Sequence, residues 1–384
     1  MRFEFGTVTR IAFGPGTVRE VAPAARELGQ RALLVTGRSQ ARAAPLLAQL
    51  KEAGIACCGC VVHDEPTVDL VRRAVEFARK ERCDLVIALG GGSALDAGKA
   101  IAALLTNGGD LMDYLEVIGQ ARPLTQPSAP FIAVPTTAGT GTEVTRNAVL
   151  ASPEHRVKVS MRSPLMLARL AVIDPELTYG LPPEVTARTG LDALTQLIEP
   201  YVSTRANPLT DGFCLEGMKR VSRSLRRACR EGDDPAARQD MAAAALLSGL
   251  ALANAGLGVV HGLAGPIGGM FPAPHGAVCA ALLPGGMETN IHALRERAPQ
   301  SDVLHRYDEI GRVLTGRPDA RAEDGVAWAK QVCRELAIPP LRSHGIGEPD
   351  FPMLVAKASQ ASSMKANPIA LTAEELRTVL DSAL

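Results

Sequence analysis

The sequence predicts an α/β N-terminal half with a doubly wound, mostly parallel sheet, followed by an all-α C-terminal half. In the first half, short apolar runs alternate with segments of helical periodicity, the pattern typical of βαβ units. In the second half, helical segments are long and strand-like runs are scarce. The pattern changes from alternating strands and helices to long helices in "LTYGLPPE" at 177–184, so we expect two domains, residues 1–182 and 183–384.

The first half contains a strand in "RALLVTG" at 31–37, a β-branched and apolar run that ends in glycine. Further strands are predicted in "IACCGCVV" at 55–62, in "CDLVIALGGGS" at 83–93 and at the start of "PFIAVPTTAGTGTEVT" at 130–145. Between them, apolar residues at helical spacing predict helices over 43–54, 67–82 and 94–105.

The second half is predicted to be helical over 182–203, 213–231 and 237–256. Segment 241–264 carries no charge apart from a protonated His261, and its length alone would allow a membrane span. Alanine, glycine, Ser248 and Asn254 dilute its hydrophobicity. We therefore interpret it as one buried helix that carries His261.

Composition narrows the class of function. Lys+Arg and Asp+Glu both number 41 among 384 residues, and aromatic residues make up 3%. The chain therefore lacks the basic surface and the stacking residues of a nucleic-acid-binding protein, and we expect a small substrate. The first ten residues hold no apolar run, so no signal peptide is expected. We predict a cytoplasmic protein without a membrane partner that forms a homodimer or higher homo-oligomer.

The eight cysteines show no metal-binding pattern in the sequence. Cys57, Cys58 and Cys60 lie in a predicted strand, where adjacent side chains face opposite sides. We expect these three to be small buried residues. The other five, Cys279 among them, follow no zinc spacing.

Two loops that follow predicted strands carry residues suited to a nucleotide. In "GGGSALDAGKA", Gly90, Gly91 and Gly92 let the backbone approach a ligand, and a helix N-terminus attracts phosphate. Ser93 and Asp96 form an S-x-x-D start that can cap this helix. A tight turn explains the glycines equally well.

The second loop, "PTTAGTGTEVT", offers hydroxyl groups that can bind phosphate, ribose or amide groups; its threonines include Thr136, Thr137, Thr140 and Thr142. A merely polar loop is the alternative. Because both loops follow strands of one sheet, a nucleotide is expected across the carboxyl ends of the strands. The first half is thus interpreted as a dinucleotide-binding domain.

The helical half contains residues suited to a divalent metal. Asp192 and Gln196 are one helical turn apart in "GLDALTQLIEPYVS", and His261 and His275 follow in a stretch rich in glycine and proline. Two imidazoles and a carboxylate suit Fe²⁺ or Zn²⁺. Histidines that only support the structure would look the same in the sequence.

Together these stretches resemble the iron-containing (group III) alcohol dehydrogenases. The resemblance runs from "IAFGPGTVREV" to about residue 290, and its most specific motifs are "GGGSALDAGKA", "PTTAGTGTEVT", "DPELTYGLPPEVTARTGLDAL" and "VHGLAGPIGGMFPAPHG". It implies a dinucleotide-binding domain, a helical domain and an active site in the cleft between them. It also implies that Gly92 and Ser93 hold the pyrophosphate, that the threonines line the cofactor, and that Lys158 contacts the nicotinamide ribose.

The resemblance implies metal ligands at Asp192, His261 and His275, which we expect to be catalytic as well. Gln196 stands where the family has its second ligand, a histidine, and Gly265 stands where a further family histidine lies near the substrate. A glutamine amide is neutral and a weaker donor than imidazole, so the affinity for Fe²⁺ should fall. We still expect Fe²⁺ or Zn²⁺, with Gln196 as a fourth candidate ligand.

The favoured function is an NAD(P)-dependent alcohol dehydrogenase or aldehyde reductase that acts on a small alcohol or aldehyde with metal assistance. The alternatives are a metal-free reductase of the maleylacetate reductase type, a lyase like dehydroquinate synthase, and a cofactor-binding protein without activity. NAD-preferring relatives carry aspartate at the position of Gly37, where it repels a 2′-phosphate. Gly37 removes that repulsion, and Arg38 and Ser39 can bind the phosphate, so NADP(H) is favoured over NAD(H).

Overall fold

The computed structural model describes residues 2–384, which form two compact units. The sheet unit comprises Gly6–Thr137 and Gly141–Tyr179. The helical unit comprises Gly180–Leu384 together with Ala138–Thr140 and residues 2–5. The main division thus falls between Tyr179 and Gly180, and two short segments of the N-terminal half cluster with the helices.

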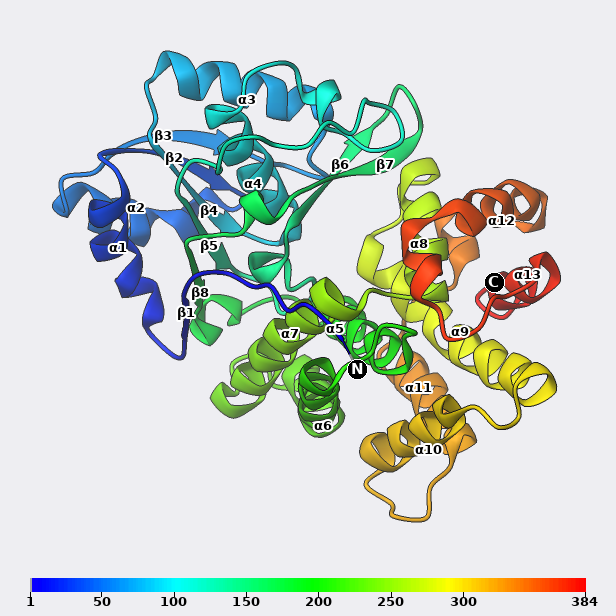
Figure 1. The fold of residues 1–384 in the computed structure, drawn as a ribbon. Helices are drawn as coiled ribbons and strands as arrows, with labels where there is room; N and C mark the ends of the chain where they lie inside the picture. Colours follow the sequence, from blue (N-terminus) through cyan, green and yellow to red (C-terminus); the bar gives the residue numbers. More distant parts are fainter. Residues whose placement is uncertain (1) are drawn as a thin grey trace. The chain divides into compact units, whose positions relative to one another are not determined.

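The sheet unit is built on six strands in the order β1-β8-β5-β4-β2-β3, and every pairing between them is parallel (Figure 1). The strands are β1 (Ile11–Phe13), β2 (Arg31–Thr36), β3 (Ala56–Val61), β4 (Leu85–Gly90), β5 (Phe131–Pro135) and β8 (Leu170–Ile173). The central strands β4 and β5 are buried along their whole length, as expected where helices cover both faces. The predicted doubly wound, parallel sheet is confirmed.

The helices of this unit are α1 (Val21–Leu28), α2 (Ala44–Glu52), α3 (Val68–Lys80) and α4 (Gly92–Thr106). Residues of α1 and α2 share one core with Leu34, Ile87 and other side chains from one face of the sheet. Helix α4 packs on the opposite face, so closely that a Cβ on Gly98 would lie 2.8 Å from the Cβ of Ala88. A hairpin of β6 (Asn147–Ser152) and β7 (Val157–Arg162) was not predicted.

The cysteines of β3 are less buried than predicted. This strand is at the edge of the sheet, Cys57 is exposed, and Cys58 and Cys60 are only partly buried. The prediction was wrong because the apolar character of "IACCGCVV" does not distinguish an edge strand from a central one. Cys58 lies against Cys83, with 3.1 Å between their sulfurs.

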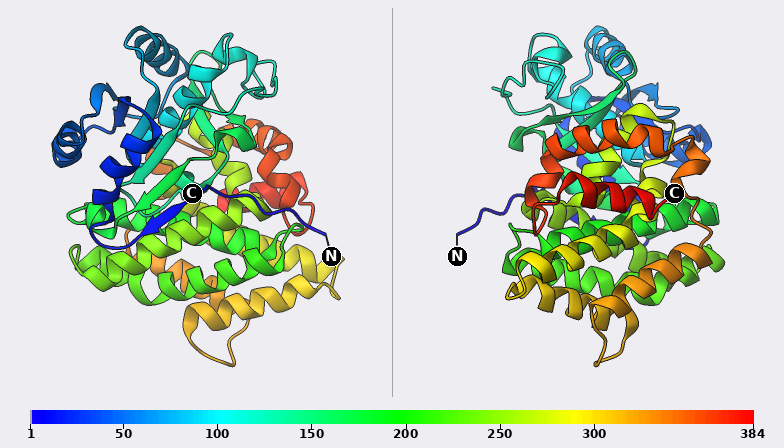
Figure 2. Two further views of the ribbon diagram at one scale, coloured as in Figure 1. Left: turned by 60° about the vertical axis from the view of Figure 1, so that its left-hand side comes forward. Right: turned by 90° about the vertical axis from the view of Figure 1, so that its right-hand side faces the viewer.

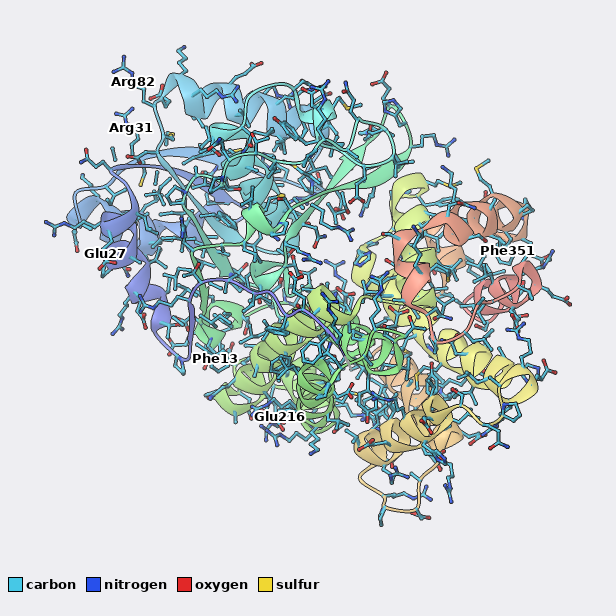
Figure 3. The ribbon with its side chains drawn as sticks, in the orientation of Figure 1. Phe13, Glu27, Arg31, Arg82, Glu216 and Phe351 are labelled. Carbon is cyan, nitrogen blue, oxygen red and sulfur yellow. The ribbon has the colours of Figure 1, made fainter. Side chains whose placement is uncertain are left out.

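The helical unit holds nine α-helices in the described chain, shown from three directions in Figures 1 and 2. They are α5 (Pro183–Val202), α6 (Pro208–Arg230), α7 (Pro235–Ala255), α8 (Val259–Met270), α9 (His275–Arg297), α10 (Asp302–Thr315), α11 (Ala322–Glu335), α12 (Phe351–Gln360) and α13 (Ala373–Asp381). Helix α5 packs against α6, α7 and α9. A second core joins α8, α9, α12 and α13 and includes Phe351 (Figure 3).

Segment 241–264 is not one helix, which corrects the prediction. Helix α7 ends at Ala255, α8 begins at Val259, and their axes differ by 98°. Gly256 has φ +76° and ψ −170°, a backbone conformation that favours glycine, and this stops α7. No single helix among residues 2–384 is long and apolar enough to cross a membrane; the bent α7–α8 pair meets that criterion by length and composition only.

Candidate metal centre

One face of α5 supplies three polar side chains to the interior of the helical unit. Asp192, Gln196 and Glu199 follow one another at spacings of four and three residues, which places them on one helical face. All three are buried. Polar groups at such positions need partners, because burial without them costs free energy.

Helices α8 and α9 bring the histidines to this face. The break after α7 redirects the chain so that His261 lies in the first turn of α8, and His275 is the first residue of α9. Gly276 permits α9 to approach α5, because a Cβ there would lie 2.6 Å from the carbonyl oxygen of Arg188. Cys279, one turn after His275, is buried beside both imidazoles.

Four ligand atoms of these side chains lie within 4.8 Å of one another: those of Asp192, His261, His275 and Cys279. Oδ1 of Asp192 is 3.5 Å from Nε2 of His261 and 3.8 Å from Nε2 of His275. Sγ of Cys279 is 3.6 Å from Nε2 of His275 and 3.8 Å from Nε2 of His261. The structure thus brings together three of the four predicted metal residues and adds a thiol.

Charge and burial act against each other in this cluster. Burial raises the pKa of Asp192, but the imidazoles of His275 and His261 outweigh it, so that the pKa is below its usual value. Burial lowers the pKa of His261, yet Cys279 and Glu199 outweigh burial and raise it well above its usual value. Cys279 is also the main cause of the raised pKa of His275. Protons and a cation would therefore compete for the same atoms.

The environment of Asp192 fits a metal ion. Its Oδ1 atom is buried and has no hydrogen-bond partner among the described residues, and the nearest imidazole nitrogen, at 3.5 Å, is too far for a strong hydrogen bond. An ionised oxygen without a donor is unfavourable in a protein interior unless a cation neutralises it. Carboxylate, imidazole and thiolate are all zinc ligands.

Gln196, predicted as a candidate ligand, lies on the same face of α5 as Asp192 and is buried. Its Oε1 atom accepts a hydrogen bond from the hydroxyl group of Ser248 at 3.0 Å. Gly265, where the resemblance implies a missing histidine, has open space around it: a Cβ there would have no heavy atom within 4 Å.

Two residues of the site were missed in the sequence. Spacings among the cysteines alone do not single out Cys279, whereas its spacing of four residues from His275 is the signal in the sequence. Glu199 is seven residues after Asp192 on the same helical face, which was the signal for a supporting role.

The predicted cofactor residues of the sheet unit gather at one edge of the sheet. Strands β2, β4 and β5 are parallel neighbours, and their carboxyl ends lead into Gly37–Ser39, Gly90–Ser93 and Thr136–Thr137. A Cβ on Gly90 would lie 3.2 Å from the backbone nitrogen of Gly37, so these two loops approach closely. The N-terminus of α4 begins at the same edge. Thr140 clusters instead with the helical unit.

Several predicted cofactor side chains already have internal partners. Arg38 pairs with the carboxylate of Asp64 and donates from Nε to the carbonyl of His63 at 2.5 Å. Lys158, on β7, forms an ion pair with Glu65 at 2.9 Å. Ser39 is exposed and caps no helix.

Asp96 has a different role from the predicted cap of α4. Gly91 precedes the helix and no side chain caps it. The carboxylate of Asp96 instead accepts from the hydroxyl of Thr142 at 2.7 Å and from the N–H of Val149 at 3.1 Å. These contacts tie the threonine loop and β6 to α4, so both residues support the loop.

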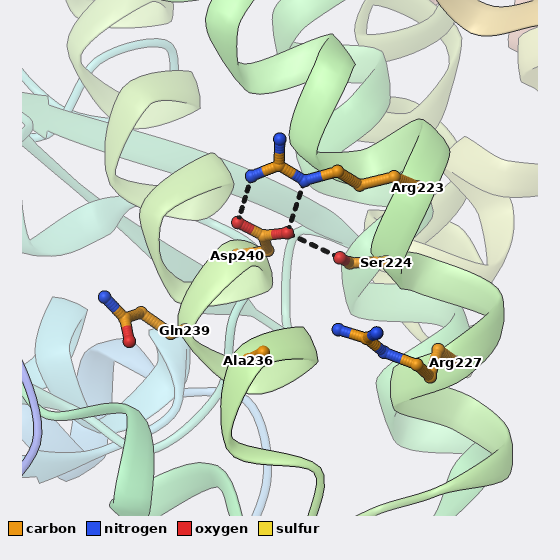
Figure 4. Close-up of a pocket in the computed structure, with 6 residues that line it drawn as sticks. All are labelled: Arg223, Ser224, Arg227, Ala236, Gln239 and Asp240. Atoms are coloured by element: carbon orange, nitrogen blue, oxygen red, sulfur yellow. Dashed lines mark hydrogen bonds and ion pairs between the residues drawn. The ribbon is translucent and has the colours of Figure 1, made fainter.

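A surface pocket of about 400 Å³ between α6 and α7 is a poor candidate for chemistry (Figure 4). Its carboxylate, Asp240, accepts two hydrogen bonds from Arg223 and one from Ser224, and Arg220 pairs with it as well. Because the charge and the acceptor atoms of Asp240 are satisfied internally, this carboxylate does not require a ligand.

The two halves of the chain match two family models of known proteins. Residues 8–175 match the family "Iron-containing alcohol dehydrogenase", and residues 186–384 match "Fe-containing alcohol dehydrogenase family, C-terminal". The chain is 36% identical to 1,3-propanediol dehydrogenase of Klebsiella pneumoniae over 381 residues, which cover 97% of this chain and 96% of that protein. It is 39% identical to alcohol dehydrogenase 4 of Schizosaccharomyces pombe over 84% of this chain and 74% of that one. The crystal structure of a 1,3-propanediol oxidoreductase superposes with a TM-score of 0.92 at 33% identity, covering 100% of both chains.

Proposed function

The chain belongs to the iron-containing alcohol dehydrogenase family, and from that premise we propose that it is a metal-assisted, NAD(P)-dependent alcohol dehydrogenase or aldehyde reductase. Membership makes it an oxidoreductase that acts on CH–OH groups and implies a metal ion and a nicotinamide coenzyme. The observation that carries the metal assistance is the buried Oδ1 atom of Asp192, which has no hydrogen-bond donor among residues 2–384 and lies beside two imidazoles.

Asp192, His261 and His275 would hold the ion. When bound, the ion supplies a Lewis acid that polarises the oxygen of the aldehyde. The side chain of His275 is 32% exposed whereas that of Asp192 is 2% exposed, so a small substrate would enter on the side of His275. Glu199 holds His261 by its Nδ1 atom and leaves Nε2 directed at the cluster.

The coenzyme supplies or accepts the hydride. We propose that the three loops after β2, β4 and β5 hold it, since glycines and hydroxyl groups meet there at the N-terminus of α4. NADP(H) is proposed to be used at least as well as NAD(H), because Gly37 places no carboxylate after β2. Asp64, paired with Arg38, is the feature that opposes this preference.

The alternatives differ in their dependence on a metal and in their products. A metal-free reductase would reduce its substrate after complete chelation. A dehydroquinate-synthase-like lyase needs several lysines and arginines for a multiply charged substrate, and residues 241–280 contain neither. A homo-oligomer and a cytoplasmic location stay predictions.

The test is steady-state turnover of an aldehyde panel with NADPH and NADH, before and after chelation and after reloading with Fe²⁺ or Zn²⁺. The panel includes the aldehyde of 1,3-propanediol, a substrate named for one relative. Expected are chelator-sensitive reduction of small aldehydes and recovery with metal. No turnover of any aldehyde would reject the dehydrogenase, and full activity without metal would reject the metal assistance.

A further inference from the structure

We propose that Cys279 is a direct ligand of the catalytic metal and that its thiolate takes the coordination place lost at Gln196. The inference rests on the proposed function, because it concerns the same ion. It assigns a ligand set of one carboxylate, two imidazoles and one thiolate. This set favours Zn²⁺ over Fe²⁺, since thiolate is a soft ligand.

The distances among the four ligand atoms suit one small ion. Bonds of about 2.0 to 2.3 Å directed to the corners of a tetrahedron place neighbouring ligand atoms about 3.3 to 3.6 Å apart. The contacts of Asp192 with the imidazole nitrogens measure 3.5 and 3.8 Å, and those of the Cys279 sulfur measure 3.6 and 3.8 Å. An ion needs to shorten each of these four contacts by only a few tenths of an ångström.

Helix geometry explains how the sulfur comes to be there. His275 and Cys279 are one turn apart on α9, so their side chains leave the same face of the helix. The same spacing joins Asp192 and Gln196 on α5. Loss of a ligand on one helix is thus matched by a thiol at the equivalent spacing on the other.

Gln196 is a weaker ligand for this place than Cys279. Its amide oxygen, the only atom with which a glutamine binds a metal well, accepts the hydroxyl hydrogen of Ser248 at 3.0 Å. The amide also carries no charge to offset that of the ion. Cys279 would do so after releasing its thiol proton to solvent on metal binding.

The test is X-ray absorption spectroscopy on the full chain, stripped with chelator and reloaded with Zn²⁺. We expect one sulfur neighbour at about 2.3 Å besides nitrogen and oxygen neighbours at about 2.0 to 2.2 Å. In Cys279→Ser the sulfur neighbour disappears, and the zinc affinity in competition with a chromophoric chelator falls at least about tenfold.

Two matched variants and a folding control accompany the test. Cys214→Ser removes a buried thiol on α6 that is not part of the cluster. The zinc site of this variant should keep its sulfur neighbour. Gln196→Ala should also keep it, with a zinc affinity within about threefold of the parent. Circular dichroism verifies that every variant is folded.

The proposal is overturned if the parent chain takes up no zinc or binds it without a sulfur neighbour. It is also overturned if Cys279→Ser binds zinc as tightly as the parent chain, or if Gln196→Ala loses zinc. The spectra are taken on resting protein, so they do not depend on turnover. Absence of aldehyde turnover in a chain that shows the sulfur neighbour would reject the proposed function and leave the ligand assignment standing.

Discussion

Oε2 of Glu199 lies 2.6 Å from Nδ1 of His261, and the other oxygen of the same carboxylate accepts the N–H of Val260 at 2.7 Å. One side chain of α5 therefore fixes both the ring of His261 and the backbone that carries it. Because Nδ1 donates to Glu199, Nε2 is the nitrogen left for the ion. Glu199 is a positioning residue, since it acts on the site through His261.

The first prediction concerns this contact. Glu199→Gln should lower the affinity for Zn²⁺ about 10- to 100-fold, because a neutral partner holds the tautomer of His261 less firmly and makes the ring a weaker donor. Chelator competition measures the change. Glu184→Gln, an exposed glutamate on the same helix, serves as control and should leave the affinity unchanged.

A second prediction concerns the approach of α9 to α5. In Gly276→Ala the new methyl group would meet the carbonyl oxygen of Arg188, a backbone atom that cannot turn away. We expect the free energy of unfolding to fall by about 1 to 3 kcal/mol and the zinc affinity to fall as His275 shifts. Urea unfolding and chelator competition measure the two effects.

The control for this change is Gly212→Ala. Gly212 is an exposed glycine within α6 with no heavy atom within 4 Å of a new Cβ. Alanine there should stabilise the chain by about 0.5 to 1 kcal/mol through its helix propensity. Equal losses in both variants would mean that the close approach at Gly276 is unimportant.

The third prediction restores the ligand that the family carries. Gln196→His should raise the occupancy of Fe²⁺, because imidazole is a stronger donor to the ion than the glutamine amide at this buried position of α5. Asp192→Ala should abolish both metal and activity. Elemental analysis beside aldehyde turnover distinguishes the outcomes, and full turnover in a metal-free parent chain would show that the ion has no part in the mechanism.

The fourth prediction concerns the coenzyme. Gly37→Asp should shift kcat/KM toward NADH by about tenfold or more, equivalent to about 1.4 kcal/mol, because a carboxylate there repels a 2′-phosphate. A Cβ on Gly37 meets nothing within 4 Å, so aspartate fits. Asp64→Asn should shift the ratio toward NADPH by releasing Arg38. A parent chain that favours NADH more than tenfold would contradict the proposed preference.

Local patterns made the sheet unit predictable. The runs at 31–37 and 83–93 contain the strands β2 and β4, because apolar and β-branched residues that end in glycine are typical of buried strands. The hairpin β6–β7 escaped prediction since each of its strands is completed only by pairing with the other, from Ser152 with Val157 outward to Asn147 with Arg162.

The candidate site was only partly predictable because two of its determinants are tertiary. The composition of 241–264 suits a continuous helix, and only the positive φ of Gly256 shows where α7 stops and why His261 is redirected. Apart from its spacing from one histidine, nothing in the sequence distinguishes Cys279 from a cysteine of the core, because only the packing of α9 on α5 brings it to the other ligands. Its neighbours in space, Asp192 and His261, are far from it in the sequence.

The last prediction concerns the dependence of stability on pH, to which two buried groups in the sheet unit contribute. Burial raises the pKa of Glu143 from 4.5 to about 7, although its own backbone N–H and Lys99 act against the rise. Burial lowers the pKa of Lys99 from 10.5 to about 8 against the attraction of Asp96 and Glu143. The ammonium group of Lys99 donates to the carbonyls of Thr142 and Asn147 and to the hydroxyl of Thr145.

The two groups act in opposite directions. Between pH 4.5 and 7 the folded chain holds the proton of Glu143 more tightly than the unfolded chain, so the stability falls as pH rises. Between pH 8 and 10.5 the unfolded chain holds the proton of Lys99 more tightly, so the stability rises with pH. Each contribution is of the order of 3 kcal/mol, and the sum of these two contributions is smallest between pH 7 and 8.

Glu143→Gln should therefore reduce the fall in the free energy of unfolding below pH 7, while the rise above pH 8 remains. Part of the fall below pH 7 should remain in this variant, because burial also raises the pKa of Asp96. Urea unfolding followed by circular dichroism from pH 5 to 10 measures the profile, with Glu76→Gln, an exposed change on α3, as control. If Glu143→Gln keeps the full slope of the parent chain below pH 7, then the carboxyl of Glu143 is not the group that destabilises the sheet unit as it ionises.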